Sequence, residues 1–354
     1  MTISRACYAT REDVKAALDV KLTARSDTLV DQAVEGASDA VDGLCNRVFY
    51  PTTATRYFDW PNYQYAAPWR LWLDRWELAD TAGVVVKSGG VTISSASVFF
   101  EPVNSGPPYT CMELDRSSTA AFVAGTTPQR DISITGPFGF WVKTAAAGTL
   151  AVALTDTTGT SVQVSNGAAV GVGDNILIGA ERMLVTDKAM VTSGQAQQGS
   201  GVGTALANDQ ALTVTDGTKF AVGEVLLLGS ERMLVVDLAG NVLTVKRGWD
   251  GTTLATHSGA TVYVSRLLTV TRGALGTTAA THLINVAVNR HVVPPLVKQL
   301  AVAEAEVTLL QQSAGYASIV GSGSGMVTGI GKGLDALRCQ ALDQFGRRAR
   351  VRAV

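Results

Sequence analysis

The chain has 354 residues, of which 46% are hydrophobic and 17% charged, so it can bury a substantial core in one large domain or in two to three ordinary ones. Its 29 basic and 30 acidic residues leave a formal net charge of −1, which gives no general argument for binding to nucleic acid or to a membrane surface. The 36 glycines, together with many threonines, valines and serines, favour β-rich structure.

The cysteines and the N-terminal segment bear on compartment. Cys7, Cys45, Cys111 and Cys339 lie far apart, and their spacing is not that of a zinc site, so we expect them to be reduced. The opening MTISRACYATRED lacks the apolar region of a signal peptide, and no run approaches the roughly 18 apolar residues of a membrane span. We therefore expect a protein made and used in cytoplasm, with no metal, no cofactor and no membrane partner.

Two helices are predicted near the N-terminus. Thr10 can cap a short helix over REDVKAALDV, because Asp13 three residues later completes a near capping box. A longer helix is predicted over residues 26–47, since its apolar residues recur at helical spacing and Pro51 forbids continuation. Its other face is either simply solvated or lines a channel or meets a neighbouring subunit; the acidic residues on that face are Asp31, Glu35, Asp39 and Asp42.

The next segment predicts a small antiparallel sheet. RLWLDRW alternates in polarity, and GVVV and SVFFEP follow as further strands separated by the turn KSGG. YTCMELD and RDISITGPFGFW continue the pattern. This is also the most aromatic part of the chain, and its tryptophans are expected in a core or, alternatively, at an interface; they are Trp60, Trp69, Trp72 and Trp76.

Residues 147–285 contain an internal duplication. IGAERMLVTD at 178–187 matches LGSERMLVVD at 228–237 at seven of ten positions. TVKRGWDGTTLATH, from Thr244, matches TVTRGALGTTAATH, from Thr269, at ten of fourteen. Matches of this length indicate duplicated small β units rather than short accidental motifs.

The order of the matching pieces predicts nesting. The first part of copy one precedes copy two, whereas its matching end follows copy two. We therefore predict that a second β unit, residues 211–265, is inserted in the first. Residues 191–210, VTSGQAQQGSGVGTALANDQ, are predicted to form a flexible passage between them.

Each copy carries an arginine and a histidine at matching positions, Arg247 with His257 and Arg272 with His282. A metal site would need more ligands than these, and the copies share no cysteine. No GxSxG turn supports a hydrolytic triad, and GSGSG is not a phosphate-binding loop. Because a fold constraint must repeat with the fold while a catalytic site need not, we expect these side chains to pin turns by hydrogen bonds.

Helical sequence returns after the duplication. Pro294 and Pro295 fit a helix start, and helical spacing continues to the end of the segment 286–312. Residues 313–354 contain the flexible or tightly turned GSGSGMVTGIGKG, then a short helix and a basic tail. Such a tail is usually solvated but could bind DNA without sequence preference; the arginines of this arm are Arg338, Arg347, Arg348, Arg350 and Arg352.

With the duplication set aside, the remaining segments resemble the head–tail connector (adaptor or head completion) proteins of long-tailed bacteriophages. The resemblance covers about 1–145 and 286–354 and rests on the order of TREDVKAAL, LCNRVFYP, RLWLDRWELADTAGVVV, PPYTCMELDR, RDISITGPFGFW and VVPPLVKQLA. We accordingly expect an α+β fold. A helical adaptor core with a small sheet (1–146 and 286–312) would be interrupted by the nested all-β units and followed by a C-terminal arm (313–354).

The resemblance implies a structural virion protein without catalysis. Members of the family form a ring, usually of twelve copies, beneath the portal; they extend the DNA channel and receive the stopper or tail. Residues 26–47 and 294–312 would then be ring helices, and 313–354 would dock on the portal. We expect the protein at the head–tail neck of the virion, after assembly in the host cytoplasm, with only non-specific contact with packaged DNA.

Two other classes of function remain open. A neck or tail protein could bind a host-surface glycan through the β units, which predicts an exposed aromatic platform with Trp249 and Tyr263 as candidates. A glycan hydrolase would need two carboxylates about 5–10 Å apart in a cleft, and the sequence nominates no such pair.

Overall fold

The computed structural model describes residues 3–18, 26–60, 68–123, 125, 127–199, 202, 204–313 and 332–347. Within these ranges the chain forms four α-helices and 17 strands in three sheets, so the protein is mostly β. The expected α+β fold built on a helical core is therefore wrong. Between residues 52 and 291 every regular element other than short 3-10 turns is a strand, and α-helices occur only toward the two ends of the chain.

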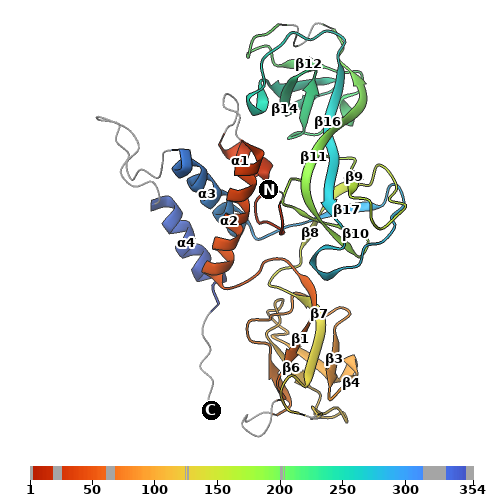
Figure 1. The fold of residues 1–354 in the computed structure, drawn as a ribbon, viewed down its shortest axis with the longest axis vertical. Helices are drawn as coiled ribbons and strands as arrows, with labels where there is room; N and C mark the ends of the chain where they lie inside the picture. Colours follow the sequence, from red (N-terminus) through yellow and green to blue (C-terminus); the bar gives the residue numbers. More distant parts are fainter. Residues whose placement is uncertain are drawn as a thin grey trace.

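The four helices come from opposite ends of the chain yet share one hydrophobic core. Apolar residues of the first pair pack against those of the second pair, and the two pairs lie side by side in Figure 1. Phe49, just after the first pair, is fully buried in the same core. The helices are α1 (Arg11–Ala17), α2 (Asp27–Cys45), α3 (Pro295–Ser313) and α4 (Lys332–Phe345).

Local sequence explains the helix ends. The Thr10 hydroxyl accepts a hydrogen bond from the backbone N–H of Asp13 at 3.0 Å, and the Asp13 carboxylate accepts one from the backbone of Thr10, which is a complete capping box. Helix α2 ends when Asn46 adopts a left-handed conformation with φ of 52°. The chain thus leaves the helix before the expected stop at Pro51.

The aromatic segment folds as a separate small β domain at one end of the molecule (Figure 1). Instead of one small sheet it holds two, which enclose a single hydrophobic core that includes Leu73, Met112 and Ile134. Trp60, Trp69 and Trp76 pack against this core, as one of the two alternatives expected. The first sheet is ordered β1 (Thr52–Phe58), β7 (Ile132–Phe138), β3 (Val85–Ser88), β4 (Val91–Ile93), and the second is ordered β2 (Arg70–Trp72), β6 (Cys111–Leu114), β5 (Val98–Glu101).

The duplicated region forms two β units with separate hydrophobic cores that share one ten-stranded sheet. Two long strands, β11 and β16, run antiparallel through both units. The strands of this sheet are β8 (Thr144–Thr149), β9 (Ser161–Gln163), β10 (Asn175–Ile178), β11 (Glu181–Ala196), β12 (Ala211–Thr213), β13 (Val225–Leu228), β14 (Glu231–Ala239), β15 (Val242–Lys246), β16 (Thr261–Thr271) and β17 (Ala287–His291).

Strand pairing joins the two separated parts of the first copy. β9 and the first half of β11 both pair with the second half of β16, and β10 pairs with β17. In the second copy the equivalent partners are β12 with β15, β15 with β14, and β13 with the first half of β16. The first unit is therefore assembled around an inserted second unit. It extends slightly beyond the expected limits, because β8 pairs with β17.

The passage between the units is not a simple flexible linker. Residues 191–196 continue β11 and pair with residues 261–264 of β16. Register shifts at Ala189/Val191 and Thr192/Gln195 interrupt this ladder, consistent with a glycine at 194 and polar residues around it. The expectation of a flexible segment over 191–210 was therefore wrong for its first six residues.

The helical bundle is tied to the β units by ion pairs. The Lys15 ammonium group on α1 lies 2.7 Å from the carboxylate of Asp250 in the second unit and also contacts Asp27 of α2. Arg11 reaches Asp187 on β11 at 2.9 Å. Helix α1 therefore contacts both halves of the duplicated region. No helix in the described part of the chain is long and apolar enough to cross a membrane.

Candidate functional site

A buried carboxylate at the start of β14 organises the repeated residues of the second unit. Glu231 is completely buried and accepts hydrogen bonds from Nε and Nη2 of Arg247 at 2.9 and 2.7 Å. It also accepts the backbone N–H groups of Gly248 and Ala255, and His257 Nε2 lies 2.9 Å from it. Since a carboxylate only accepts, Nε2 carries the proton. The glutamate thus holds the turn after β15 against the start of β14.

The first unit repeats this network with residues that are about ninety to a hundred positions apart. Glu181 accepts from Arg272 at 2.7 and 2.9 Å, from the N–H groups of Gly273 and Ala280, and from His282 at 2.8 Å. Burial alone would raise the pKa of Glu181, but these donors lower it to about 2. The carboxylate therefore stays ionised as the counterion of a buried arginine.

These networks leave little capacity for chemistry. Each carboxylate has its oxygens occupied by five donors, and each arginine also donates to backbone carbonyls, those of Thr204 and Ala255 in the second unit. The described residues contain no group of three or more His, Cys, Asp or Glu side chains that could hold a metal ion. The repeats GAERM and GSERM show Glu181 and Glu231 as matching acidic residues, which the sequence favours as part of an ordinary charged pair on a strand. Sequence reasoning missed that each glutamate is the partner of the repeated arginine and histidine.

The acidic face expected on the long helix does not form one open surface. Asp31 is only 4% exposed, and Arg11 binds it through two hydrogen bonds of 2.8 and 2.7 Å. This bidentate pair joins α1 to α2 inside the bundle. Asp31 is therefore a structural residue, and its side chain is not available to line a channel.

The other three carboxylates of that face are contacted by the N-terminal segment. Arg5 pairs with Asp39 and, at 2.6 Å, with Asp42. The backbone and hydroxyl of Ser4 both donate to Glu35. Only Asp39 keeps a largely exposed side chain, at 67%. The sequence could not show that the N-terminal segment contacts these carboxylates, because the residues that pair lie more than thirty positions apart.

The C-terminal arginines are also not a free arm where the structure describes them. Arg338 forms two hydrogen bonds, of 2.6 and 2.8 Å, with Glu304 on α3. Helix α4 packs its apolar residues into the bundle, so the expectation of a separate arm is wrong for residues 332–347. Arg347 crosses to the small β domain and lies 3.2 Å from Glu77. Three further arginines of the expected arm lie outside the described residues: Arg348, Arg350 and Arg352.

The aromatic residues proposed for glycan binding do not form a platform. Trp249 is 6% exposed, with the Lys246 ammonium group 5.6 Å from its ring centre. Tyr263 is 40% exposed on β16, but in the described part of the chain no second aromatic ring pairs with it. Because a sugar-binding platform needs an accessible aromatic face, the structure gives this alternative no specific support.

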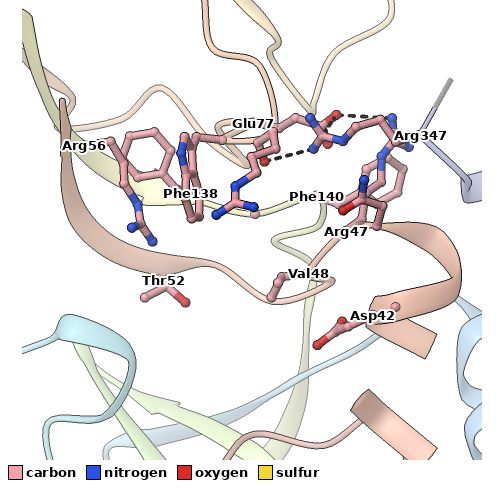
Figure 2. A pocket seen from close by; sticks show the side chains of 14 residues that line it. Asp42, Arg47, Val48, Thr52, Arg56, Glu77, Phe138, Phe140 and Arg347 are labelled. Atoms are coloured by element: carbon pink, nitrogen blue, oxygen red, sulfur yellow. Dashed lines mark hydrogen bonds and ion pairs between the residues drawn. The ribbon is translucent and has the colours of Figure 1, made fainter. Parts of the chain in front are cut away.

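A cavity of about 380 Å³ lies between the end of α2 and the small β domain (Figure 2). Four arginines from distant parts of the chain line it: Arg47, Arg56, Arg75 and Arg347. Its walls also carry the rings of Phe138 and Phe140. Glu77, which is 4% exposed, lies 3.2 Å from both Arg47 and Arg347. Sequence reasoning missed this site, because no local motif unites positions 47, 56, 75 and 347.

No protein-family model, curated protein or solved structure matches this chain. The functional argument therefore rests on the residues themselves and on their arrangement.

The third histidine gives the bundle a pH-dependent contact. His291 Nε2 donates to the backbone carbonyl of Phe49 at 2.8 Å, while Nδ1 has no hydrogen-bond partner. Burial lowers the pKa of His291 to about 4. The hydrogen bond to Phe49 opposes this shift, so it is burial that makes the charged ring costly in the folded state.

We expect the free energy of unfolding to fall as the pH drops from 6.5 toward 4. The unfolded chain takes up a proton on His291 near its ordinary pKa of about 6.5, whereas the folded protein does not, and the difference amounts to about 3 kcal/mol. Substituting His291→Gln keeps a donor toward Phe49 without a titrating ring. Denaturant unfolding of both proteins at pH 7 and pH 4.5 should show a smaller acid loss in the variant; equal losses would contradict the assignment.

Proposed function

We propose that this protein is a structural virion component of a long-tailed bacteriophage, a head-to-tail adaptor that forms a homo-oligomeric ring beneath the portal. In that position it would extend the DNA channel and receive the stopper or tail. One observation carries the proposal. Helices α1 and α2 pack into one core with α3, which follows them after about 250 residues of β structure, as the adaptor resemblance predicts. Helix α4 also joins this core, which the resemblance does not predict.

The arrangement of the parts also supports a structural role. The small β domain and the two β units each have their own hydrophobic core, and they extend along the molecule from one helical bundle (Figure 1). The buried carboxylates have structural partners: Glu181 and Glu231 hold turns, and Glu224 binds Arg266 and the backbone of Gly167. An elongated molecule of this kind can contact several neighbours at once, which a connector between head and tail must do.

The structure narrows which residues can serve this role. Asp31 is buried and paired, so any acidic channel surface on α2 is reduced to Asp39 and the partly exposed Glu35 and Asp42. The portal-binding arm is likewise reduced, because α4 is part of the bundle. The residues of the proposed portal-binding arm that remain are 314–331 and 348–354, which lie outside the described part of the chain.

A stop codon in the gene for this protein tests the proposal. We expect DNA-filled heads and complete tails to accumulate separately, and a plasmid copy of the gene to restore joined particles. Tailed particles that form normally but fail to adsorb to cells would contradict the adaptor role and support the glycan-binding alternative. Normal infectious particles would contradict both.

A further inference from the structure

The cavity between α2 and the small β domain has an excess of positive charge that the other described residues do not neutralise. Four guanidinium groups line it, and Glu77 neutralises only the side shared by Arg47 and Arg347. The second acidic residue of the lining, Asp42, is already bound by Arg5 and by the hydroxyl of Tyr8. The contacts of Arg47 and Arg347 run to Glu77 and, from Arg347, to the backbone carbonyl of Arg75, and Figure 2 shows no dashed contact at Arg56.

Two of the arginines are left without an acidic partner in the described part of the chain, Arg56 and Arg75. The guanidinium carbons of both lie over the ring of Trp76, at 3.7 and 4.7 Å from its centre. The Nε atom of Arg56 is buried and has no hydrogen-bond partner. Burial and the positive charge of Arg75 both lower the pKa of Arg56, so an anion beside these two groups would offset that electrostatic cost.

The shape of the cavity selects the kind of anion. A volume of about 380 Å³ admits one or two side chains, and a rigid duplex cannot enter it. The aromatic walls favour an aliphatic or aromatic neighbour beside the charge. Guanidinium groups present parallel N–H donors that match a carboxylate with two hydrogen bonds.

We propose that this cavity is a docking site for a carboxylate-bearing, partly apolar segment of another protein chain. Arg56 and Arg75, both held on the ring of Trp76, bind the carboxylate, and Phe138 and Phe140 contact the apolar part of the segment. Arg47 and Arg347 are positioning residues, because Glu77 holds them in place and Arg347 links the end of α4 to the small β domain. The proposal does not depend on the adaptor role and stands or falls separately from it.

The full-length protein can be titrated by calorimetry at low salt with the peptide acetyl-EEFEE-amide. The uncharged acetyl-QQFQQ-amide, inorganic phosphate and a short DNA duplex serve as comparison probes. We expect saturable binding of the acidic peptide with a dissociation constant below about 1 mM, and much weaker binding of the other three. Binding of phosphate as tightly as the peptide would show a site for small anions and overturn the proposal, as would preference for the duplex or no binding at all.

Three variants locate the site. Arg56→Gln and Arg75→Gln should each weaken peptide binding about tenfold, since each removes a charge-assisted hydrogen bond. Arg116→Gln is the matched control, because Arg116 also lies over a tryptophan ring of the small β domain, 4.3 Å from the centre of Trp69, but outside the cavity. Equal affinities in all three variants would overturn the assignment. Because Arg75 is exposed and has no ion-pair partner in the described part of the chain, its variant should lose only the contact with Trp76 and unfold within a few degrees of the parent protein.

Discussion

Replacing Glu231 with glutamine is expected to lower the free energy of unfolding of the second β unit by about 3–5 kcal/mol. Glutamine has nearly the same shape, but it cannot neutralise Arg247, whose side chain is fully buried. The variant also places an amide N–H₂ group among donors that need an acceptor. The loss is large because a buried charge without its partner is much costlier than a missing surface contact.

Hydrogen exchange of the amides in β12 to β15 measures this effect where it occurs. The first unit has its own core and its own glutamate, so its exchange should change little, and Glu181→Gln should produce the reciprocal result. Glu113→Gln is the surface control, since its partner Arg70 is 40% exposed, and a loss below about 1 kcal/mol is expected there. If Glu231→Gln cost no more than this control, the network would not be what holds the turn.

Substituting Phe49→Ala is expected to destabilise the helical bundle by about 3–5 kcal/mol. The ring is fully buried and meets three aromatic rings edge-on: Tyr8 from the N-terminal segment, Phe140 from the connection after β7 and Phe345 from α4. Its removal leaves a cavity at the point where both ends of the chain meet. Urea unfolding followed by circular dichroism at 222 nm reports this loss, because that signal comes mainly from the helices.

A double-mutant cycle with Phe345→Ala tests whether α4 belongs to the bundle in solution. We expect a coupling energy between Phe49 and Phe345 of about 0.5–1.5 kcal/mol, as for other buried aromatic pairs. Phe99→Ala on the surface of the small β domain is the control, because that ring is 52% exposed. Additive effects of Phe49→Ala and Phe345→Ala would mean that α4 leaves the bundle, which is what a free portal-binding arm requires.

Helices and repeats were predictable because their signals are local. Thr10 and Asp13 cap α1 as their spacing predicts. The helix predicted over 26–47 from its apolar spacing contains the observed helix α2, Asp27–Cys45. The order of the matching repeat positions likewise predicted that the separated parts of the first copy pair with each other, as β9 does with β16 and β10 with β17. In each case the residues that carry the signal are within a few positions of one another or recur in the same order.

The errors came from contacts between distant residues. The acidic residues of α2 have the pattern of a solvated face, and only the fold brings Arg5 and Arg11 onto them. Phe345 packs against Phe49 and so holds α4 in the core. The polar, glycine-rich sequence around α4 gives no sign of this packing. The predicted α+β fold class is wrong because the helical signal is confined to the two ends of the chain, whereas the abundance of glycine, threonine and valine indicates the β structure between them.

The cavity lined by four arginines shows the same limit at a candidate site. Each arginine is unremarkable in its own segment, and the charge excess exists only after α2, β1, the 75–77 segment and the end of α4 have come together. A similar convergence creates the Glu181 network, in which His282 and Arg272 lie about a hundred residues from their partner. Sequence alone could find the repeated histidine and glutamate but not that the two side chains pair.

Cryo-electron microscopy of particles that contain this protein, focused on the head–tail neck with ring symmetry imposed, tests the central proposal most directly. The adaptor role predicts a ring of density beneath the portal into which the α1–α4 bundle fits, with the small β domain and the two β units projecting from it. Density at the tail tip, or a neck without this protein, would contradict the adaptor role.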